Sequence, residues 1–513
     1  MLQERMKSWE SAEPRAVQEI VAWQSRHSPE RIALVEDGRR CSYRELQRTI
    51  EATEKWLAQS GVRARDRVML ICENSIAAVA LYFACTSLGA WPVIVNARLS
   101  PREIDEIYAH CGSRLVVFTT ACSLRAREHA KRYEAQAVSR LSEAVAATAV
   151  SEQAEQDSFE DDEQSEVAAV IYTTGTTGRP KGVMLSHGNL LFVARVTADA
   201  RRLSSQDRVY ATLPISHSLG LTGVLLGALL SGAKIQLSPR FDPARIFVAL
   251  RAGDVSVMIG TPSMYAMLVE HARRNGLLPI AAPALRLISS AGAPLDAATK
   301  AEAEAAFRLT LHNGYGISEC GPSIALTSIE SPRSDCSVGR LLPDVEARLV
   351  SDAGESGVDV GELWVRSPGV MKGYYRAPEE THQVIDHASW FRTGDLARLE
   401  DGHLFIVGRA KEMIVRFGFN VYPAEIEAVL NGHPKVLRSA VVGRAQSGTE
   451  EIVAFVQLTP GADATAAELD AHAAARLAPY KRPNEIVLVG EMPMSANGKI
   501  RKAELLALCS RGR

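Results

Sequence analysis

The sequence predicts an α/β protein of more than one domain, and three observations carry this prediction: chain length, globular composition, and apolar runs that alternate with amphipathic segments. The chain has 513 residues, whereas one compact domain holds roughly 100 to 200 residues. Hydrophobic residues make up 46% and charged residues 23%. This composition supplies enough apolar material for a core and argues against a disordered, collagen-like or coiled-coil chain. An active site can therefore lie between structural units.

The first alternating stretch begins at Arg67. Residues 67–71, 91–96 and 114–120 are strand candidates, and residues 77–88 and 101–110 are helix candidates. Apolar strands that alternate with helices predict a parallel sheet covered on both faces.

An acidic segment, residues 151–166, separates this stretch from a second one, and we expect it to be a solvated linker. Strand and helix candidates alternate again after it, which predicts two similar α/β halves. The strand candidates are residues 166–174, 233–238, 255–260, 285–292 and 309–316, and the helix candidates are residues 243–253 and 295–307.

From about Val345 the strand candidates shorten and turn sequences such as SDAGESG and LEDGH become frequent, which predicts a smaller antiparallel unit. The last hundred residues have a β and α pattern of their own. Residues 438–444, 450–458 and 485–490 are strand candidates, and residues 466–477 form a helix candidate. We expect a small C-terminal domain there.

The charge balance argues against nucleic acid as a partner. Lys and Arg number 58 against 60 Asp and Glu, for a net charge of -2, and nucleic-acid binding usually needs a basic domain or stripe.

The cysteines and the apolar segments indicate the compartment. The eight cysteines are scattered without a CxxC pair, so neither a disulfide framework nor a zinc site is predicted, and the reducing cytoplasm is expected. Residues 1–15 are polar and charged, which does not predict a secretion signal. The most apolar window, residues 219–233, is shorter than the roughly 20 residues of a membrane span. It predicts a buried helix and no transmembrane segment.

The strongest local pattern is the glycine-rich segment YTTGTTGRPKGVMLSH, residues 172–187, which follows a predicted strand and precedes a predicted helix. Its glycines let backbone amides turn toward a ligand, its threonines add hydroxyl donors, and Lys181 adds a positive charge. This chemistry suits a polyphosphate. The segment is not a Walker P-loop, because Lys181 follows Pro180 and precedes Gly182.

This segment resembles the phosphate loop of the adenylate-forming superfamily, which includes acyl- and aryl-CoA ligases, adenylation domains of peptide synthetases and beetle luciferases. The resemblance covers roughly residues 31–502 and favours the CoA-ligase branch. Four further segments are similar to the superfamily's motifs in the same order: NGYGISE (313–319), TGD (393–395), GRAKEMIVRFGFNVYPAEIE (408–427) and PMSANGKIRK (493–502).

The resemblance implies a domain plan. Residues 1–408 would form a large N-terminal adenylation domain of two similar parallel-sheet subdomains and a small antiparallel, barrel-like subdomain. Residues 409–412 would be a hinge, and residues 413–513 a small, mobile α+β C-terminal domain.

The resemblance also implies ATP, Mg²⁺ and coenzyme A as ligands. In the reaction of this superfamily a carboxylate attacks the α-phosphorus of ATP, so positioned cations and donors should stabilise the charge that develops on phosphate oxygens. The residues implied to hold the β- and γ-phosphates are Thr173, Thr174, Gly175, Thr176, Thr177, Gly178 and Lys181.

The NGYGISE segment would hold the adenine and the metal ion. Tyr315 would stack on the adenine, with Asn313 and Gly316 beside it. Glu319 would bind Mg²⁺, a cation that prefers oxygen ligands. Ser318 stands where the family more often has Thr, and it keeps a hydroxyl for the α-phosphate.

Asp395 and Arg409 would bind the ribose hydroxyls, one as acceptor and one as donor. Lys499 matches the lysine that bridges the substrate carboxylate and the α-phosphate. Lys411 matches the residue about which the C-terminal domain rotates between adenylation and thioester formation, and Gly418 would let the pantetheine arm pass close to the backbone.

The segment LPISHSLG, residues 213–220, matches the entry to the acid site. Amino-acid-activating relatives have an Asp near this position, whereas this chain has His217, a candidate gate beside the substrate carboxylate. The positions implied to line the pocket are Leu219, Gly223, Ser289, Gly292, Gly314, Pro322 and Ser323. None is charged and three are glycines, so we expect a roomy apolar pocket that fits an aryl ring or an alkyl chain equally.

The predicted function is therefore an acid:CoA ligase acting on a hydrophobic monocarboxylic acid. Two alternatives stay open, a stand-alone enzyme that loads a carrier protein's phosphopantetheine and a luciferase-like oxygenase. Luciferases have a lysine four residues after the hinge, and Val415 stands there instead. The sequence leaves open which acid is used, which residues hold the CoA 3′-phosphate, and whether the chain forms a homodimer.

Overall fold

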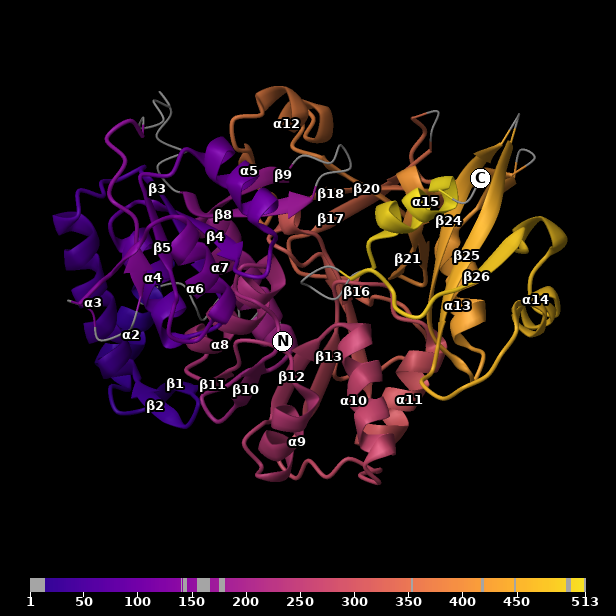
Figure 1. Cartoon of the computed structure of the whole chain (residues 1–513), viewed down its shortest axis with the longest axis horizontal. Helices are drawn as coiled ribbons and strands as arrows, with labels where there is room; N and C mark the ends of the chain where they lie inside the picture. The colour runs from indigo at the N-terminus through magenta and orange to yellow at the C-terminus, as the bar shows by residue number, and fades with distance from the viewer. Residues whose placement is uncertain are drawn as a thin grey trace.

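The chain is an α/β protein with two large mixed sheets, a small antiparallel sheet and a separate C-terminal domain (Figure 1). The structure is a computed structural model, which describes residues 14–139, 141, 145–154, 167–174, 180–351, 354–416, 419–446, 449–494 and 500–511. Within the described part of the chain, no helix is both long and apolar enough to span a bilayer.

The first large sheet has the strand order β19-β9-β8-β4-β3-β5-β7-β6. Its central strands β3, β4, β5 and β8 are parallel, and the strands toward both edges are antiparallel. The candidates for β3, β4 and β5 were predicted together, but the candidate at residues 166–174 was predicted in the second half, and this was wrong: as β8 it pairs with β4 of the first sheet. The strands are β3 (Arg67–Cys72), β4 (Trp91–Asn96), β5 (Leu115–Phe118), β6 (Gln136–Ala137), β7 (Ala146–Ala147), β8 (Val167–Thr174), β9 (Pro180–Ser186) and β19 (Gly373–Tyr374). The helices of this part are α3 (Tyr43–Gln59), α4 (Ile76–Ser87), α5 (Pro101–Cys111) and α6 (Leu124–Arg132).

The second large sheet has the strand order β16-β15-β14-β13-β12-β10-β11-β1-β2. Its strands are β1 (Ile32–Glu36), β2 (Arg39–Ser42), β10 (Arg208–Ala211), β11 (Lys234–Leu237), β12 (Val257–Gly260), β13 (Leu287–Ser290), β14 (Leu311–Tyr315), β15 (Ala325–Leu326) and β16 (Arg340–Leu341). Its helices are α2 (Glu19–His27), α7 (His187–Ala200), η2 (Leu219–Leu226), α8 (Gly227–Leu230), α9 (Pro243–Arg251), α10 (Pro262–Arg274), α11 (Ala297–Phe307) and the short η3 (Ser318–Cys320).

Three features of these sheets go beyond the sequence analysis. The hairpin β1–β2 precedes the first predicted strand, yet β1 pairs in parallel with β11 of the second sheet. Strand β10 was not predicted. The second half of the glycine-rich segment returns as β9, antiparallel to β8, before helix α7 begins. This segment is therefore a hairpin that leads into a helix.

Helix α4 explains how the two large sheets pack together. It contacts β3 and β4 of the first sheet and β1 of the second, and its residues from Ile76 to Thr86 are all buried. A helix that packs between two sheets is apolar all round rather than on one face. Ser75 accepts a hydrogen bond from the amide of Ala78 and caps its N-terminus.

The predicted buried helix at residues 219–233 is present as η2 followed by α8. All residues of η2 are buried and it has the wider π-helical winding. Gly220 is required there, because a Cβ at this position would lie 2.0 Å from the carbonyl oxygen of Pro214.

The small antiparallel sheet and the C-terminal domain follow in the order that the sequence predicted. The four-stranded sheet comprises β17 (Glu346–Val350), β18 (Val360–Arg366), β20 (Phe391–Glu400) and β21 (His403–Arg409), with α12 (Pro378–Val384) beside it. After η4 (Ala410–Glu412), the C-terminal domain contains β22 (Ile414–Arg416), β23 (Phe419–Val421), α13 (Pro423–Asn431), β24 (Val436–Gln446), β25 (Thr449–Leu458), α14 (Ala466–Ala474), η5 (Pro479–Lys481), β26 (Glu485–Leu488) and α15 (Lys502–Arg511).

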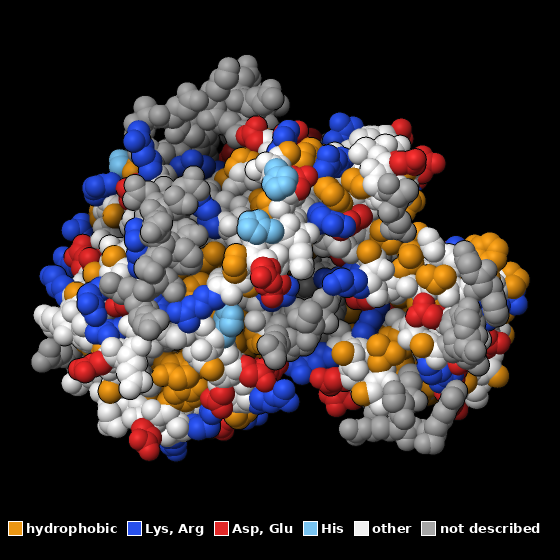
Figure 2. Space-filling view, turned by 90° about the horizontal axis from the view of Figure 1, so that it is seen from above, with side chains coloured by type: hydrophobic (Ala, Val, Ile, Leu, Met, Phe, Trp, Pro, Cys, Tyr) orange, Lys and Arg blue, Asp and Glu red, His pale blue; other side chains and the backbone are white. Residues whose placement is uncertain are grey.

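The C-terminal domain has its own two apolar clusters, centred on Ile452 and Phe455 and separate from the core of the body. Seen from above, it forms a smaller lobe with a notch between it and the body (Figure 2). Two neighbouring clusters on the two faces of its sheet β24-β25-β26 give it a core of its own.

A buried carboxylate fastens the N-terminal ends of three strands in the second sheet. Asp207, which precedes β10, accepts two hydrogen bonds of 2.8 Å from Arg286, which precedes β13. It also accepts one of 2.8 Å from the Ser256 hydroxyl, which precedes β12, and one from the backbone of Ser204. Burial opposes ionisation, but these hydrogen bonds hold the pKa of Asp207 below its usual value.

We therefore expect Asp207→Asn to lower the free energy of unfolding by about 2 kcal/mol at neutral pH, because charge-assisted hydrogen bonds are lost from a buried site. Since the folded-state pKa is lowered, the stabilisation is present above the unfolded pKa of about 4 and is lost as the pH falls through the folded value. Urea denaturation of both proteins between pH 7 and pH 3 measures this difference.

The matched control is Asp254→Asn, whose carboxylate is 54% exposed and lies 3.5 Å from Lys234. An exposed pair of this kind contributes about 0 to 1 kcal/mol. Equal losses for the two variants at pH 7 would contradict the role assigned to Asp207.

Candidate active site

The three sheets of the body meet at a group of side chains from the predicted motifs. Tyr315 ends β14, and its hydroxyl donates a 2.6 Å hydrogen bond to Oδ2 of Asp395 on β20. Arg409 lies opposite Asp395 on β21, with Nε 3.3 Å from Oδ1. Asp395 is 5% exposed. Burial and the charge of Asp395 raise the pKa of Tyr315 well above its usual value, so this hydroxyl stays a proton donor.

A second tyrosine connects Glu319 with the glycine-rich hairpin. The hydroxyl of Tyr374 on β19 donates a 3.0 Å hydrogen bond to Oε1 of Glu319. The ammonium of Lys181 on β9 lies 4.8 Å from the centre of the Tyr374 ring, a cation–π distance. Burial and the charge of Glu319 raise the pKa of Tyr374. One aromatic residue therefore contacts both the predicted phosphate-binding lysine and the predicted metal-binding carboxylate.

The two groups are neighbours. Burial and the negative charges of Glu319 and Asp395 together raise the pKa of the Cys320 thiol, which lies beside both carboxylates. Glu319 also follows Tyr315 by four residues, so Lys181, Glu319 and Asp395, which come from three different sheets or their ends, are linked through Tyr374 and Tyr315 into one group of side chains.

Tyr374 was not identified from the sequence. It lies in the run KGYYR, residues 372–376, between β18 and β20 of the small sheet. In the sequence, the sign that could have identified Tyr374 is a pair of adjacent tyrosines with turn residues on either side. Only the pairing of β19 with β9, Tyr374 opposite Val183, brings this segment to the site.

The NGYGISE turn depends on the close approach of two chain segments. A Cβ at Gly316 would lie 1.6 Å from the carbonyl oxygen of Pro322, and one at Gly314 would lie 2.7 Å from Leu326. No other residue fits at Gly316 without moving the backbone. The side chain of Asn313 donates to the carbonyl oxygens of Cys336 and Ser337, which anchors β14 to the segment before β16.

The acid-entry segment contacts this turn. The hydroxyls of Ser218 and Ser318 are 2.9 Å apart and both residues are buried. The backbone amide of Leu219 donates a 3.2 Å hydrogen bond to Nδ1 of His217. Because Nδ1 accepts, the neutral ring carries its hydrogen on Nε2. His217 is partly exposed, as a residue at the entrance of a site must be.

The predicted acid-binding residues gather between η2 and the ends of β13 and β14. Methyl groups built at Gly223 and Gly292 would both contact Leu219, at 3.0 Å and 4.0 Å. Arg201, a charged residue that was not predicted from the sequence, lies beside these residues. Its Nη1 would be 3.4 Å from the methyl group built at Gly223. The remaining predicted positions are Ser289 on β13, Gly314 on β14, and Pro322 and Ser323 in the turn after η3.

Several predicted residues lie outside the described part of the chain. These are Gly175, Thr176, Thr177 and Gly178 of the phosphate loop, Gly418, and the predicted catalytic lysine Lys499. Of Thr174 only the backbone position at the end of β8 is described, and Thr173 lies opposite Lys181 in the hairpin.

The residues before and after the predicted hinge Lys411 contact different parts of the molecule. Arg409 contacts Asp395 of the body. Three residues later, Glu412 lies 2.8 Å from Lys502, which is also 2.9 Å from Glu427. Lys411 is exposed between these two contacts. Within the tail motif, Arg501 lies 3.8 Å from Glu103 on α5, so this end of the C-terminal domain faces the body.

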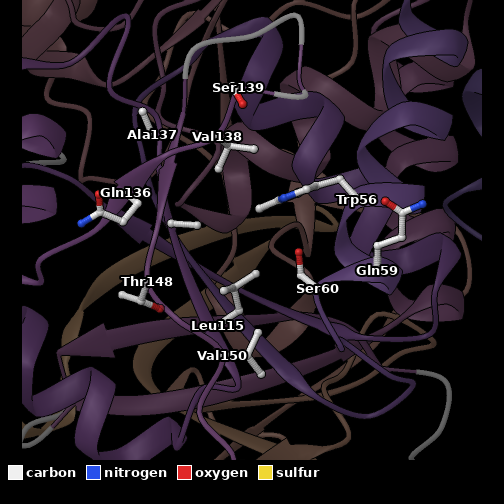
Figure 3. Close-up of a pocket in the computed structure, with 11 residues that line it drawn as sticks. Trp56, Gln59, Ser60, Leu115, Gln136, Ala137, Val138, Ser139, Thr148 and Val150 are labelled. Carbon is white, nitrogen blue, oxygen red and sulfur yellow. The ribbon is translucent and has the colours of Figure 1, made fainter.

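A cavity of about 400 Å³ lies elsewhere (Figure 3). It is lined by residues of α3, β5 and β7, including Leu115 and Thr148, and Trp56 points across it toward Val138. The strands β7 and β6 form the edge of the first sheet opposite to β9 and β19. This cavity is therefore separate from the site.

A single carboxylate beside a lysine and glycine-rich loop fits Mg²⁺ bound mainly by nucleotide phosphates, since this ion is usually held by one or two carboxylates and by substrate phosphates. Among the described residues, no cluster of three or more His, Cys, Asp or Glu could hold a metal ion.

Comparisons with known proteins agree with these motifs. The sequence model of the AMP-binding enzyme family matches residues 21–375, and that of the AMP-binding enzyme C-terminal domain matches residues 425–499. A feruloyl-CoA synthase of Amycolatopsis sp is 33% identical over 94% of this chain and 96% of its own. A 2-succinylbenzoate–CoA ligase of Geobacillus kaustophilus is 32% identical over 94% of this chain and 96% of its own.

The fold is similar to that of solved structures over almost the whole chain. The crystal structure of ATP-bound MatB from Rhodopseudomonas palustris superposes with a TM-score of 0.83 at 28% identity, covering 96% of this chain and 99% of that one. With the family models, the relatives and the fold in agreement, the chain belongs to the AMP-binding enzymes, the adenylate-forming superfamily, and within it to the acyl- and aryl-CoA ligases.

Proposed function

We propose that the chain joins an aryl or fatty acid to coenzyme A through an acyl-adenylate. ATP and the acid give the adenylate and pyrophosphate, and the CoA thiol then displaces AMP to give the thioester. The observation that carries the proposal is the convergence of Lys181, Glu319 and Asp395 on one site through Tyr374 and Tyr315. The names of the relatives, which include feruloyl-, indoleacetate- and long-chain-fatty-acid–CoA ligases, support both acceptor and acid class.

We assign each residue a role in binding and charge stabilisation. Lys181, with the glycine-rich loop of residues 173–178, holds the β- and γ-phosphates. Glu319 holds Mg²⁺, which supplies positive charge to the phosphate oxygens. Asp395 and Arg409 bind the ribose, and Asp395 is oriented for this by the hydroxyl of Tyr315.

The acid enters past His217, whose orientation is set by the amide of Leu219. It lies against Leu219 and the glycines at 223, 292 and 314, with its carboxylate toward the Ser218–Ser318 contact. Ser318 donates to the α-phosphate. Adenine stacks on Tyr315, beside Asn313 and Gly316, whose backbone is fixed by the turn described above.

Rotation of the C-terminal domain about Lys411 makes the second half-reaction, thioester formation, possible. The contacts of Glu412 and Glu427 with Lys502 make residues from 412 onward part of the C-terminal lobe, which supports a boundary at residues 409–412 between a body of residues 1–408 and a C-terminal domain of residues 413–513. Lys499 enters the site for adenylation, and Gly418 faces the pantetheine arm after rotation. We place the enzyme in the reducing cytoplasm, since its described cysteines are free thiols, and leave open a homodimer.

The proposal is tested by acid-dependent exchange of pyrophosphate into ATP with a panel of aryl and alkyl acids, followed by thioester formation on adding CoA. Exchange with thioester formation only on a carrier protein would support the carrier-loading alternative. Light emission or oxygen uptake would support the oxygenase. Absence of exchange with every acid would refute the proposal.

Lys499→Ala separates the two half-reactions. We expect it to lower the rate of adenylate formation by about a hundredfold or more, because the charge that bridges carboxylate and phosphate is removed. Conversion of preformed acyl-adenylate and CoA to thioester should stay within about threefold, since Lys499 acts only in the first conformation. Lys435→Ala, which removes an exposed lysine of the same domain, is the control. An equal fall in both half-reactions would show that the assigned role is wrong.

Tyr374→Phe tests the residue that contacts both Lys181 and Glu319. The variant keeps the ring beside Lys181 and removes the hydrogen bond to Glu319, so we expect kcat/KM for MgATP to fall about tenfold, the size expected for a hydrogen bond to a charged group. The KM for the acid should change less than about twofold. Tyr375→Phe, at the adjacent residue whose hydroxyl faces the Cys111 carbonyl, should leave both constants unchanged. Unaltered MgATP kinetics in Tyr374→Phe would contradict the assignment.

A further inference from the structure

Arg201 is a buried cation beside the predicted acid-binding residues. It caps the C-terminus of α7 and is only 2% exposed. Its guanidinium donates one hydrogen bond, of 3.3 Å, from Nη1 to the carbonyl oxygen of Gly223. Within the described part of the chain, Nε has no hydrogen-bond partner and no carboxylate forms an ion pair with this side chain.

A second polar group among the predicted acid-binding residues is also without a partner. The hydroxyl of Ser289 is buried and, among the described residues, makes no hydrogen bond. Ser289 was predicted to line the acid pocket, and it lies opposite His312 in the pairing of β13 with β14. The Tyr265 hydroxyl donates to the Ser289 carbonyl and accepts from the Ser289 amide, so the backbone at Ser289 is fixed while its side-chain hydroxyl is left to a ligand.

The groups around Arg201 do not compensate its charge. Burial lowers the pKa of Arg201 to about 10. Burial also raises the pKa of the nearby Tyr265 phenol, which therefore stays neutral and supplies no counter-charge. The pKa of His312 is lowered by burial and by the charge of Lys300, so this ring is neutral at pH 7. An unpaired buried charge costs several kcal/mol in general, and a group of this kind is a candidate for contact with a ligand.

The position of Arg201 relative to the acid follows from η2. Leu219 and Gly223 are one helical turn apart, and His217, at the entrance, precedes both. Nη1 of Arg201 and the side chain of Leu219 both lie on the side of Gly223 where a Cβ would project. An acid whose carboxylate lies near His217 and Ser318 thus directs its opposite end along Leu219 toward Arg201.

From this placement we propose that Arg201 determines specificity by binding an oxygen acceptor at the far end of the acid, with the Ser289 hydroxyl as a second donor. The substrate class is then an aryl or alkyl acid that carries a distal oxygen group. A second carboxylate, which neutralises the guanidinium, is preferred over a neutral hydroxyl, and a hydroxyl over hydrogen. This proposal rests on the proposed acid:CoA ligase function and specifies its substrate. A preference for a second carboxylate departs from the hydrophobic monocarboxylic acid predicted from the sequence, because Arg201 was not among the predicted pocket residues.

The first test uses the unaltered enzyme and needs no variant. Acid-dependent pyrophosphate exchange is measured with cinnamates that carry a para carboxylate, a para hydroxyl or hydrogen, and with octanedioate against octanoate. We expect kcat/KM to fall about tenfold or more from the carboxylate to the hydrogen compound in each series, as for loss of a hydrogen bond to a charged group. Equal values, or a preference for the unsubstituted acids, would overturn the proposal.

The second test substitutes the arginine. Arg201→Met should lower kcat/KM for the oxygen-bearing acids about tenfold through KM, leave the unsubstituted acids within about twofold or improve them, and leave the KM for ATP unchanged. Arg201→Lys keeps the charge and should restore part of the preference. Arg202→Met, at the neighbouring exposed arginine that pairs with Glu330, is the matched control and should behave as the unaltered enzyme.

A fall of the same size for every acid in Arg201→Met would indicate a purely structural role and refute the proposal. If the methionine variant does not fold, the lysine variant and the substrate series decide the question. The proposed function fails separately: exchange with no acid refutes both, whereas exchange that is indifferent to the distal group refutes only the role of Arg201.

Discussion

Two hydrogen bonds from tyrosines to carboxylates hold the site together. Tyr315 to Asp395 joins the second large sheet to the small antiparallel sheet, and Tyr374 to Glu319 joins the first large sheet to the turn after β14. Away from water, a hydrogen bond to a charged acceptor is strong, and a carboxylate left without a partner lowers the stability of the fold. Each sheet therefore fixes the position of a charged group that another sheet supplies.

This arrangement suits chemistry on a polyphosphate. Glu319 and Asp395 each accept a hydrogen bond from a phenol, while the cation Lys181 lies beside one phenol and Arg409 lies beside Asp395. Preorganised charges of this kind stabilise developing charge without reorganising during the reaction. Burial and the nearby carboxylates raise the pKa values of both tyrosines, so both hydroxyls remain hydrogen-bond donors at neutral pH.

The ion pairs on the two sides of the hinge belong to different lobes. Arg409 pairs with Asp395 of the body, whereas Glu412, three residues later, pairs with Lys502 of the C-terminal domain. Lys502 lies between Glu412 and Glu427, and their charges outweigh the effect of burial and raise the pKa of Lys502. The lobe can thus move as a unit, since its own ion pairs and apolar clusters travel with it.

The sequence by itself determined the fold class, the order of the domains and the family, because these follow from local features: the period of the apolar residues, the turn residues, and motifs of contiguous residues such as NGYGISE and the glycine-rich segment. It also indicated Lys181, Glu319 and Asp395 as members of one site, through the order of their motifs. Tertiary structure decided what depends on long-range pairing. Strand β1 joins the second sheet across two hundred residues. Tyr374 reaches Glu319 only because β19 pairs with β9. Arg201, at the end of helix α7, becomes a buried charge because its side chain packs against Gly223 of η2. No local pattern encodes these contacts, since burial and the identity of a partner are properties of segments that meet only in the folded chain.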